Sequence, residues 1–325
     1  MRTKIVYVLV SQETDYYYEM LQLSLYSLRL YHPNDVVEVV MDEDTYSRLE
    51  EVEAPILKDI VPNVVSVSDE YTLIQRSRYL KTRLRQIVKG DFLFIDTDTI
   101  VCESLSDIDN VEADVAMVAD ENTDHAYSHK PQRDLNDKAG FERKDSDPYY
   151  NSGVIFVRDS QQAMMLFDAW HTLWRQSLRN GVTQDQPALC QANADLGFPI
   201  RELSGVWNCQ VFTPAGVMLI NNSKVFHYWG SIKKDACARI EHLLRHIKNN
   251  GRITEAVAQV ARNPRTTGYS LFTMSDERAF QFFYSDFLYI FDNVSPLYRC
   301  LSTLARLLLK PVQAVSRLKR GSGKR

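Results

Sequence analysis

Two aspartates stand one residue apart in the segment FLFIDTDTIV, residues 92–101, where an apolar run ends on Asp96 and Asp98. One chemistry that uses such a pair is phosphoryl transfer, in which the first carboxylate attacks phosphorus and the second moves a proton. Another is sugar transfer, in which the pair holds a divalent metal against a nucleotide diphosphate. A strand followed by a polar turn would also place two aspartates here, so the rest of the chain has to discriminate.

A second motif, FHYWGSIKK, carries His227, Gly230 and Lys233 at three-residue spacing after the apolar run KVF. A divalent cation neutralises the charge that develops on a departing diphosphate, and it prefers oxygen ligands, although manganese also accepts imidazole. His227 could therefore complete a metal shell with Asp96 and Asp98. Gly230 would let the backbone approach phosphates, and Lys233 could pair with them.

Strand-like and helix-like segments alternate through the first hundred residues. This alternation predicts an α/β fold with a mostly parallel sheet flanked by helices. Asp96 and Asp98 then fall at the carboxyl end of the fourth strand, where open α/β sheets bind their ligands. The predicted strands cover residues 4–10, 36–41, 63–68 and 91–96, and the predicted helices cover residues 17–32, 42–52 and 77–90.

The alternation is less regular in the second half of the chain. DVAMVAD reads as a strand that ends on Asp120, and YYNSGVIFV reads as another strand, residues 149–157. The polar segment between them, residues 121–150, is expected to form a loop over the site. A helix is predicted for residues 160–179, with Trp170 and Trp174 on its core face, and the chain beyond residue 234 is expected to be mostly helical.

Composition limits the classes of function. The net charge of −4 gives no reason to expect a nucleic acid partner. Five scattered cysteines without a Cys-x-x-Cys motif argue against a disulfide framework or a zinc site, so we expect a reduced, cytoplasmic setting. The first apolar run is too short for a signal peptide, and no stretch approaches the roughly 18 apolar residues of a spanning helix.

The phosphoryl-transfer alternative has a specific form. The letters DTDT match the Asp-x-Asp-x-Thr motif of haloacid-dehalogenase phosphatases, in which Asp96 would be the nucleophile. Those enzymes place the motif on their first strand and need a later pair of acids for magnesium. Here three predicted strands precede the motif, and no convincing later pair follows it. This alternative is therefore disfavoured but stays open.

Four motifs, FLFIDTDTIV, YYNSGVIFV, TQDQPAL and FHYWGSIK, occur in the order and rough spacing seen in glycosyltransferase family 8, which the chain resembles over residues 4 to about 235. The resemblance implies a GT-A (Rossmann-like) fold. It also implies a retaining enzyme that uses Mn²⁺ or Mg²⁺ and a nucleotide-sugar donor, commonly a UDP-sugar. Such an enzyme would transfer a hexose-type sugar to a hydroxyl of a glycan or glycolipid acceptor. A catalytically inactive protein that binds nucleotide-sugar is the other alternative.

The resemblance also implies roles for individual residues. Asp185 and Gln186 match the pair beside the anomeric carbon, where Asp185 would act as a nucleophile or shield an oxocarbenium-like transition state. Asn151 matches the residue that hydrogen-bonds sugar hydroxyls. The remaining implied contacts are Asp96, Asp98 and His227 to the metal, Lys233 and Gly230 to the diphosphate, Arg78 or Lys81 and Asp120 to the donor, and Val10 and Ser11 where the base is held.

Two places depart from the pattern of the family. After the first strand the chain reads VSQETDYYYE, where many members have Asp-Asp-x-Tyr, so the identity of the base stays open. The last motif continues with Lys-Lys-Asp instead of Lys-Pro-Trp, so a sibling GT-A family also fits. We expect a catalytic domain over residues 1–235 and a helical C-terminal extension with a basic amphipathic tail over residues 236–325.

The tail has an unusual charge. From Pro296 onward there are eight Lys or Arg and no Asp or Glu. On a helical wheel the basic residues and the aliphatic residues cluster on opposite sides, which suits a helix at an anionic membrane surface. The basic set is Arg299, Arg306, Lys310 and Arg317, and the aliphatic set is Leu301, Leu304, Leu308, Val312 and Val315.

We predict that the full-length protein binds the surface of anionic vesicles without crossing them, because each basic group at the surface contributes roughly 1 kcal/mol. Flotation with liposomes tests this. The full chain should float with anionic vesicles and not with neutral ones, and a version that ends at Ser295 should not float. Equal flotation of the two proteins would contradict this prediction, whose alternative is that the aliphatic side docks on the catalytic domain.

Overall fold

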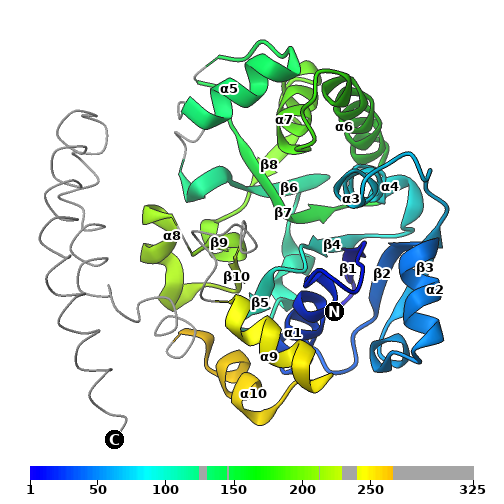
Figure 1. Ribbon diagram of the computed structural model, residues 1–325. Helices are drawn as coiled ribbons and strands as arrows, with labels where there is room; N and C mark the ends of the chain where they lie inside the picture. Colours follow the sequence, from blue (N-terminus) through cyan, green and yellow to red (C-terminus); the bar gives the residue numbers. More distant parts are fainter. Residues whose placement is uncertain (124–129, 145, 212, 229–239, 266–325) are drawn as a thin grey trace, which may run out of the picture. The chain divides into compact units, whose positions relative to one another are not determined.

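The computed structural model describes residues 1–265 apart from 124–129, 145, 212 and 229–239 (Figure 1). The described residues belong to one compact unit, residues 1–271. Gly230, Lys233 and the basic tail lie outside the described residues, so their expected roles stay predictions. Among the described residues, no helix has both the length and the apolar character needed to cross a bilayer.

A seven-stranded sheet forms the centre of this unit, with the order β3-β2-β1-β4-β7-β6-β8. β7 runs antiparallel to its neighbours β4 and β6, and the other pairs of strands are parallel. The expected mostly parallel sheet is confirmed. The strands are β1 (Lys4–Leu9), β2 (Val37–Asp42), β3 (Val61–Val65), β4 (Phe92–Ile95), β6 (Val115–Ala119), β7 (Tyr150–Val157) and β8 (Ile200–Glu202).

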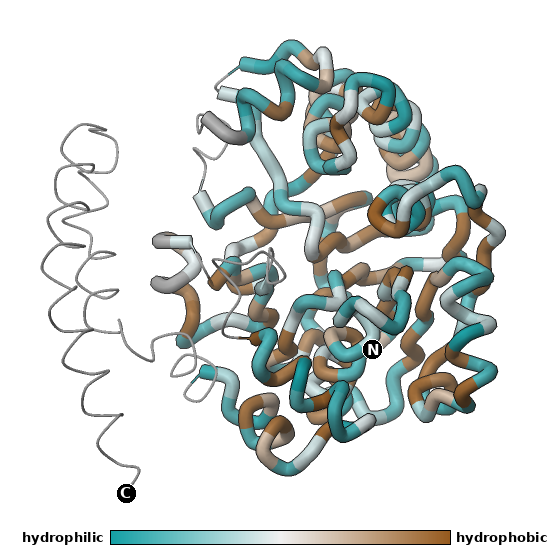
Figure 2. The backbone as a smooth tube through the Cα atoms, in the orientation of Figure 1, coloured by the Kyte–Doolittle hydropathy of each residue, from teal (hydrophilic) through white to brown (hydrophobic). Residues whose placement is uncertain are grey.

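Helices cover both faces of this sheet, and apolar residues follow its strands (Figure 2). In β1, Ile5 and Tyr7 join one apolar cluster and Val6 and Val8 join another, because successive side chains of a strand point to opposite faces. The first cluster includes residues of α1 (Tyr17–Arg29) and α2 (Glu43–Glu51). The second includes residues of α3 (Leu73–Thr82), α4 (Leu84–Ile87), α6 (Gln161–Arg179) and α7 (Gln186–Asp195).

A smaller sheet completes the edge at which the parallel strands end. It consists of β5 (Thr99–Val101), β10 (Val225–His227) and β9 (Cys209–Gln210), in the order β5-β10-β9. His227 pairs with Thr99 in the antiparallel register of β10 and β5. This pairing brings the last motif of the sequence beside the Asp-x-Asp turn. The helices α8 (Pro214–Leu219), α9 (Glu241–Asn250) and α10 (Glu255–Arg262) follow β9 and β10, and α9 and α10 contact α1.

Three predicted elements differ from the structure in ways that have a physical reason. The third strand was predicted to start after Pro62, but β3 includes this proline because β3 is an edge strand and proline is tolerated there. The segment 121–150, predicted as a loop, contains the helix α5 (Lys130–Ala139). The sequence lacks the apolar periodicity that predicts a helix, because a polar residue, Asn136, occupies a position as fully buried as that of Ala139.

The helix predicted for residues 77–90 starts earlier and is divided. Thr72 and Gln75 form a capping box, in which the Thr72 hydroxyl accepts from the Gln75 N–H and the Gln75 side chain accepts from the Thr72 N–H. The helix therefore begins at Leu73. It ends at Arg83, whose backbone is not helical and separates α3 from α4.

We predict that Trp174→Ala lowers the free energy of unfolding by about 3–5 kcal/mol, because the large ring is fully buried in the core. The ring also donates from Nε1 to the Thr183 carbonyl at 3.2 Å. Urea unfolding followed by circular dichroism measures the change. Met165→Ala on the same helix, where the side chain is exposed, is the control and should change stability by no more than about 0.5 kcal/mol.

Candidate functional site

The turn between β4 and β5 carries Asp96 and Asp98. The Asp96 N–H donates to the Gly153 carbonyl at 2.8 Å, and the Asp98 carbonyl accepts from the Tyr228 N–H at 2.9 Å. The Thr99 hydroxyl donates to the Asp96 carbonyl at 2.8 Å. Both carboxylates keep about a fifth of their side-chain surface exposed, 23% for Asp96 and 21% for Asp98. The turn is thus fixed by its neighbours while its carboxylates stay accessible.

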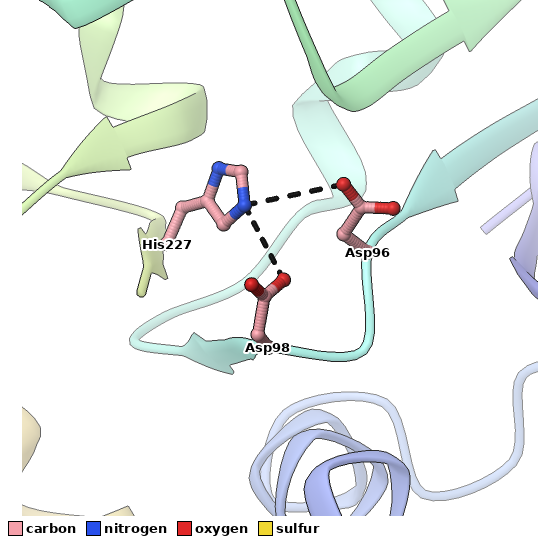
Figure 3. Close-up of side chains that lie close together, drawn as sticks. All are labelled: Asp96, Asp98 and His227. Carbon is pink, nitrogen blue, oxygen red and sulfur yellow. Dashed lines mark ion pairs between the residues drawn. The ribbon is translucent and has the colours of Figure 1, made fainter. Parts of the chain in front are cut away.

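The ring of His227 points between the two carboxylates (Figure 3). Its Nε2 lies 3.3 Å from Asp98 Oδ1 and 3.9 Å from Asp96 Oδ2. Asp96, Asp98 and His227 can each offer one ligand atom, and these three atoms lie within 4.8 Å of one another. Within the described ranges, no other group of three His, Cys, Asp or Glu residues has this geometry. The structure therefore brings together the three residues expected to bind the metal.

Gly153 makes room for this ring. A Cβ atom at this position would lie 2.2 Å from His227 Cε1 and 2.6 Å from His227 Nδ1, far inside van der Waals contact. Any other residue here would displace either the imidazole or the backbone of β7. The glycine of the Asn-Ser-Gly motif is thus required by the close approach of His227.

The hydrogen bonds around His227 determine which ring nitrogen carries the proton. Asn151 Oδ1 accepts from the Gly153 N–H at 2.9 Å, which fixes the orientation of this amide because a backbone N–H can only donate. The same oxygen accepts from Asn208 Nδ2 at 2.9 Å, so Asn208 presents its Oδ1 to His227 Nδ1, also at 2.9 Å. In the neutral ring Nδ1 therefore carries the proton.

His227 Nε2 then offers a lone pair toward the carboxylates. This nitrogen is buried and makes no hydrogen bond of acceptable geometry. Two carboxylates and one imidazole form a donor set that suits manganese, and the hydrogen bond at Nδ1 is the outer-shell contact that metal-binding histidines usually make. The residues present fit a divalent cation. Asp96 and Asp98 differ in their electrostatics. Burial raises the pKa of Asp96, whereas the pKa of Asp98 falls because attraction to the His227 ring in its protonated form and to Lys81 outweighs the effect of burial.

A network of buried amides continues from Asn151 to Asp120. Asn151 Nδ2 donates to Asp120 Oδ1 at 3.0 Å and lies 3.3 Å from Gln210 Oε1. Burial raises the pKa of Asp120 even though Asn151 and Gln132 donate hydrogen bonds to it. Asn151 is only 7% exposed, and both polar atoms of its side chain are engaged within the protein.

The backbone after Asp120 adopts an uncommon conformation. Glu121 and Asn122 both have left-handed φ values, 55° and 57°. Gln210 holds this turn, since its Oε1 accepts from the Glu121 N–H at 2.8 Å and its own N–H donates to Asn122 Oδ1 at 2.8 Å. Asn122 Nδ2 also donates to the Asn208 carbonyl at 2.9 Å. Such conformations cost about 1–3 kcal/mol each and persist where the surroundings determine them, frequently at functional sites.

Two cations on α3 pair with carboxylates of this site. Lys81 Nζ is 3.0 Å from both carboxylate oxygens of Asp96 and 3.9 Å from Asp185 Oδ2. Arg78 Nε is 3.1 Å from Asp185 Oδ1, and the Ser152 hydroxyl donates to Asp185 Oδ2 at 3.0 Å. Burial favours protonation of Asp185, but Arg78 and Lys81 outweigh it and lower the pKa of this carboxyl. Asp185 is therefore a buried, ionised carboxylate.

A pocket of about 150 Å³ opens beside these charges. Its apolar wall includes Val10, Tyr17 and Ile74, and its polar wall includes Arg78, Lys81, Asp96 and Asp98. Val10, implied by the resemblance to contact the base, thus lines this pocket. Ser11 does not line the pocket: its N–H and carbonyl contact Thr45, and its hydroxyl donates to Asp15.

Four residues of this site were not assigned roles from the sequence. Gly153 and Ser152 lie inside a recognised motif, but their contacts with His227 and Asp185 depend on the fold. Asn208 and Gln210 are fully buried in VWNCQVF, where amides alternate with apolar residues. Amide residues within a short apolar segment are a sequence signal for a buried polar network.

The fold is shared with solved glycosyltransferases. The structure of the galactosyltransferase LgtC in complex with donor and acceptor sugar analogs matches with a TM-score of 0.52 and 16% identity, over 78% of this chain and 98% of that chain. The glycosyltransferase GlyE of Streptococcus pneumoniae matches with a TM-score of 0.50 and 12% identity, over 83% of this chain and 64% of that chain. No curated protein sequence matches. At these identities the similarity shows the fold alone, which is the expected GT-A fold.

A family comparison extends this result from fold to family. Residues 32–237, more than half of the chain, match the nucleotide-diphospho-sugar transferase family. The matched region starts just after α1 and runs through the strand that carries His227, so it contains the Asp-x-Asp turn, the Asn-Ser-Gly strand and Asp185. The match and the shared GT-A fold together confirm the resemblance found in the motifs, and the chain belongs to the nucleotide-diphospho-sugar transferase family.

Proposed function

We propose that this transferase moves a hexose-type sugar from a UDP-sugar to a hydroxyl of a glycan or glycolipid, with retention at the anomeric carbon and with Mn²⁺ or Mg²⁺ as cofactor. The observation that carries the proposal is the cluster of Asp96, Asp98 and His227, whose ligand atoms lie within 4.8 Å of one another. The orientation of the imidazole, with its Nε2 lone pair toward the carboxylates, supports a metal over a simple ion pair.

The metal, when bound, would neutralise the negative charge that develops on the departing diphosphate. Asp96, Asp98 and His227 would hold it. Arg78 and Lys81 lie on the wall of the adjoining pocket, where they add positive charge for the donor. Its apolar wall, with Val10 and Tyr17, suits the nucleoside, because ligand pockets combine an apolar surface with a few fixed polar groups.

Asp185 supports the proposal of retention. It is 4% exposed, and two cations and one hydroxyl hold it in the ionised form. The Trp170 indole donates to its backbone carbonyl at 2.9 Å and fixes the start of α7. A carboxylate held in this way can stabilise positive charge at an anomeric carbon, whether it forms a covalent bond or acts only through its charge. Gln186, next in the chain, is proposed to contact the same sugar.

We also propose that the enzyme acts at the cytoplasmic face of a membrane, on a lipid-linked glycan. The support is the basic tail described above, which would hold the active site near such an acceptor. Gly230 and Lys233 are proposed diphosphate contacts on the basis of their motif. The phosphatase alternative is not retained, because the chain belongs to a transferase family and Lys81 engages both oxygens of the carboxylate that would be the nucleophile.

A thermal-shift panel of nucleotide sugars, with and without Mn²⁺, tests the proposal. UDP-sugars should stabilise the protein only with Mn²⁺, by about 2.7 kcal/mol at 100 times Kd. Asp96→Asn and Asp98→Asn should stay folded but lose this stabilisation and the metal-dependent hydrolysis of the donor. Asp91→Asn, at the other end of β4, is the matched control and should keep both. Wild-type turnover by both site variants, or aryl phosphatase activity lost in Asp96→Asn, would contradict the proposal.

His227→Ala should raise the Mn²⁺ concentration for half-maximal donor hydrolysis at least about tenfold, because one ligand is lost, while the acceptor KM changes little. Gly153→Ala should have the same effect without removing a ligand, because its methyl group would displace the ring. The measurement is a Mn²⁺ titration of activity for each variant. An unchanged titration in His227→Ala would place the imidazole outside the coordination shell.

A further inference from the structure

Lys81 is an unusual component of the site. Its side chain is 2% exposed, yet its ammonium contacts both oxygens of Asp96 at 3.0 Å and lies 3.9 Å from Asp185. The ammonium also lies 4.9 Å from the centre of the Phe94 ring. A buried charge loses its hydration, so an apolar residue of similar length would often be equally stable at such a position. This cost suggests a role for the charge itself.

The charge competes with a metal for the same ligand. Asp96 offers its two oxygens to Lys81, and Asp96 is also one of the three residues that can hold the cation. Asp185 depends on Lys81 much less, because Arg78 lies closer to it, at 3.1 Å, and Ser152 donates to it. Removing the ammonium would therefore act mainly on Asp96.

The sum of charges leads to a specific consequence. Arg78 pairs with Asp185, Lys81 pairs with Asp96 and Asp185, and the His227 ring lies beside Asp96 and Asp98. Three carboxylates, two cations and a neutral imidazole give this cluster a net charge of −1. A divalent cation alone would change this charge to +1 in a largely buried site. A diphosphate that arrives with the metal would remove the excess positive charge.

We propose that Lys81 is a built-in counter-cation that holds Asp96 in the absence of metal, so that the divalent ion binds tightly only together with a nucleoside diphosphate. The inference rests on the proposed function and adds to it that the metal enters and leaves with the donor and its product. Lys81 is in this sense a positioning residue that sets the affinity of its neighbour for metal. Metal and diphosphate each raise the affinity of the other by the same factor, because the linkage is reciprocal.

Electron paramagnetic resonance of free Mn²⁺ measures binding without any turnover. In the wild type, Mn²⁺ alone should bind weakly, and saturating UDP, or pyrophosphate as a probe without a base, should tighten it. Lys81→Met should bind Mn²⁺ alone at least about tenfold more tightly, a change of about 1.4 kcal/mol. The extra affinity that the diphosphate confers should be smaller in this variant, since the loaded site is then neutral.

Lys81→Gln separates charge from hydrogen bonding and serves if Lys81→Met does not fold. It keeps a donor for Asp96 but no charge, so it should also bind Mn²⁺ more tightly. Lys224→Met is the matched control, because Lys224 also pairs with two carboxylates, Glu103 and Asp107, and lies 5.0 Å from an aromatic ring centre. Its affinity for Mn²⁺ should equal that of the wild type.

The outcomes separate this inference from the proposed function. If Mn²⁺ binding depends on Asp96 but is no tighter in either Lys81 variant, the counter-cation role is overturned and the metal site stands. If Asp96→Asn leaves the binding of Mn²⁺ unchanged with and without UDP, the metal site itself is wrong, and the role of Lys81 is overturned with it.

Discussion

The close approach of the His227 ring to the backbone of Gly153 is the contact on which the rest of the site depends. It joins the small sheet, which carries His227, to β7 of the main sheet, and it leaves no space for a Cβ. The carbonyl of Gly153 also accepts from the Asp96 N–H. One short segment of β7 therefore sets the positions of the imidazole and of the turn that carries the two aspartates. Backbone packing therefore holds together the carboxylates and the imidazole of the candidate metal site.

The amide network extends this order into the interior. Asn151, Asn208 and Gln210 are buried, and each one determines the orientation of the next through hydrogen bonds that allow only one arrangement of donors and acceptors. Buried networks of this kind are stable only when their members are satisfied, and they then specify a single structure. Here the Gly153 N–H fixes the orientation of the Asn151 amide, which fixes that of Asn208, and Asn208 in turn places the proton of the neutral His227 ring on Nδ1. It also holds the left-handed turn that follows Asp120.

The charges of the site follow a different rule from its amides. Asp96 follows β4 and Asp185 precedes α7. Of the two basic residues of α3, Lys81 contacts both acids and Arg78 contacts Asp185. Burial would favour the neutral form of each acid, and the cations of α3 counteract this for Asp185. A site that alternates charges in this way is close to neutral before its substrate binds. On the proposed function, such a site would accept a dication and a diphosphate together at little electrostatic cost.

Much of this protein was determined by its sequence. The apolar run before Asp96, the regular alternation of strands and helices, and the order of four motifs predicted the parallel sheet, the position of the carboxylates at a strand end and the family. Local patterns suffice there because strand ends, caps and motif spacing are properties of neighbouring residues. Local signals failed for α5, which was predicted as a loop because its residues are mostly polar. They also placed the start of α3 too late, at residue 77 instead of Leu73.

The tertiary structure alone decided the contacts between distant segments. The antiparallel insertion of β7, the pairing of His227 with Thr99, and the choice of Asn208 as the partner of the imidazole join residues that the sequence separates widely. The sequence offered Arg78 or Lys81 as the basic group of the site, and the fold places both there but gives only Lys81 to Asp96. Such pairings depend on how strands register and helices pack across the whole core, and no local pattern of residues encodes them.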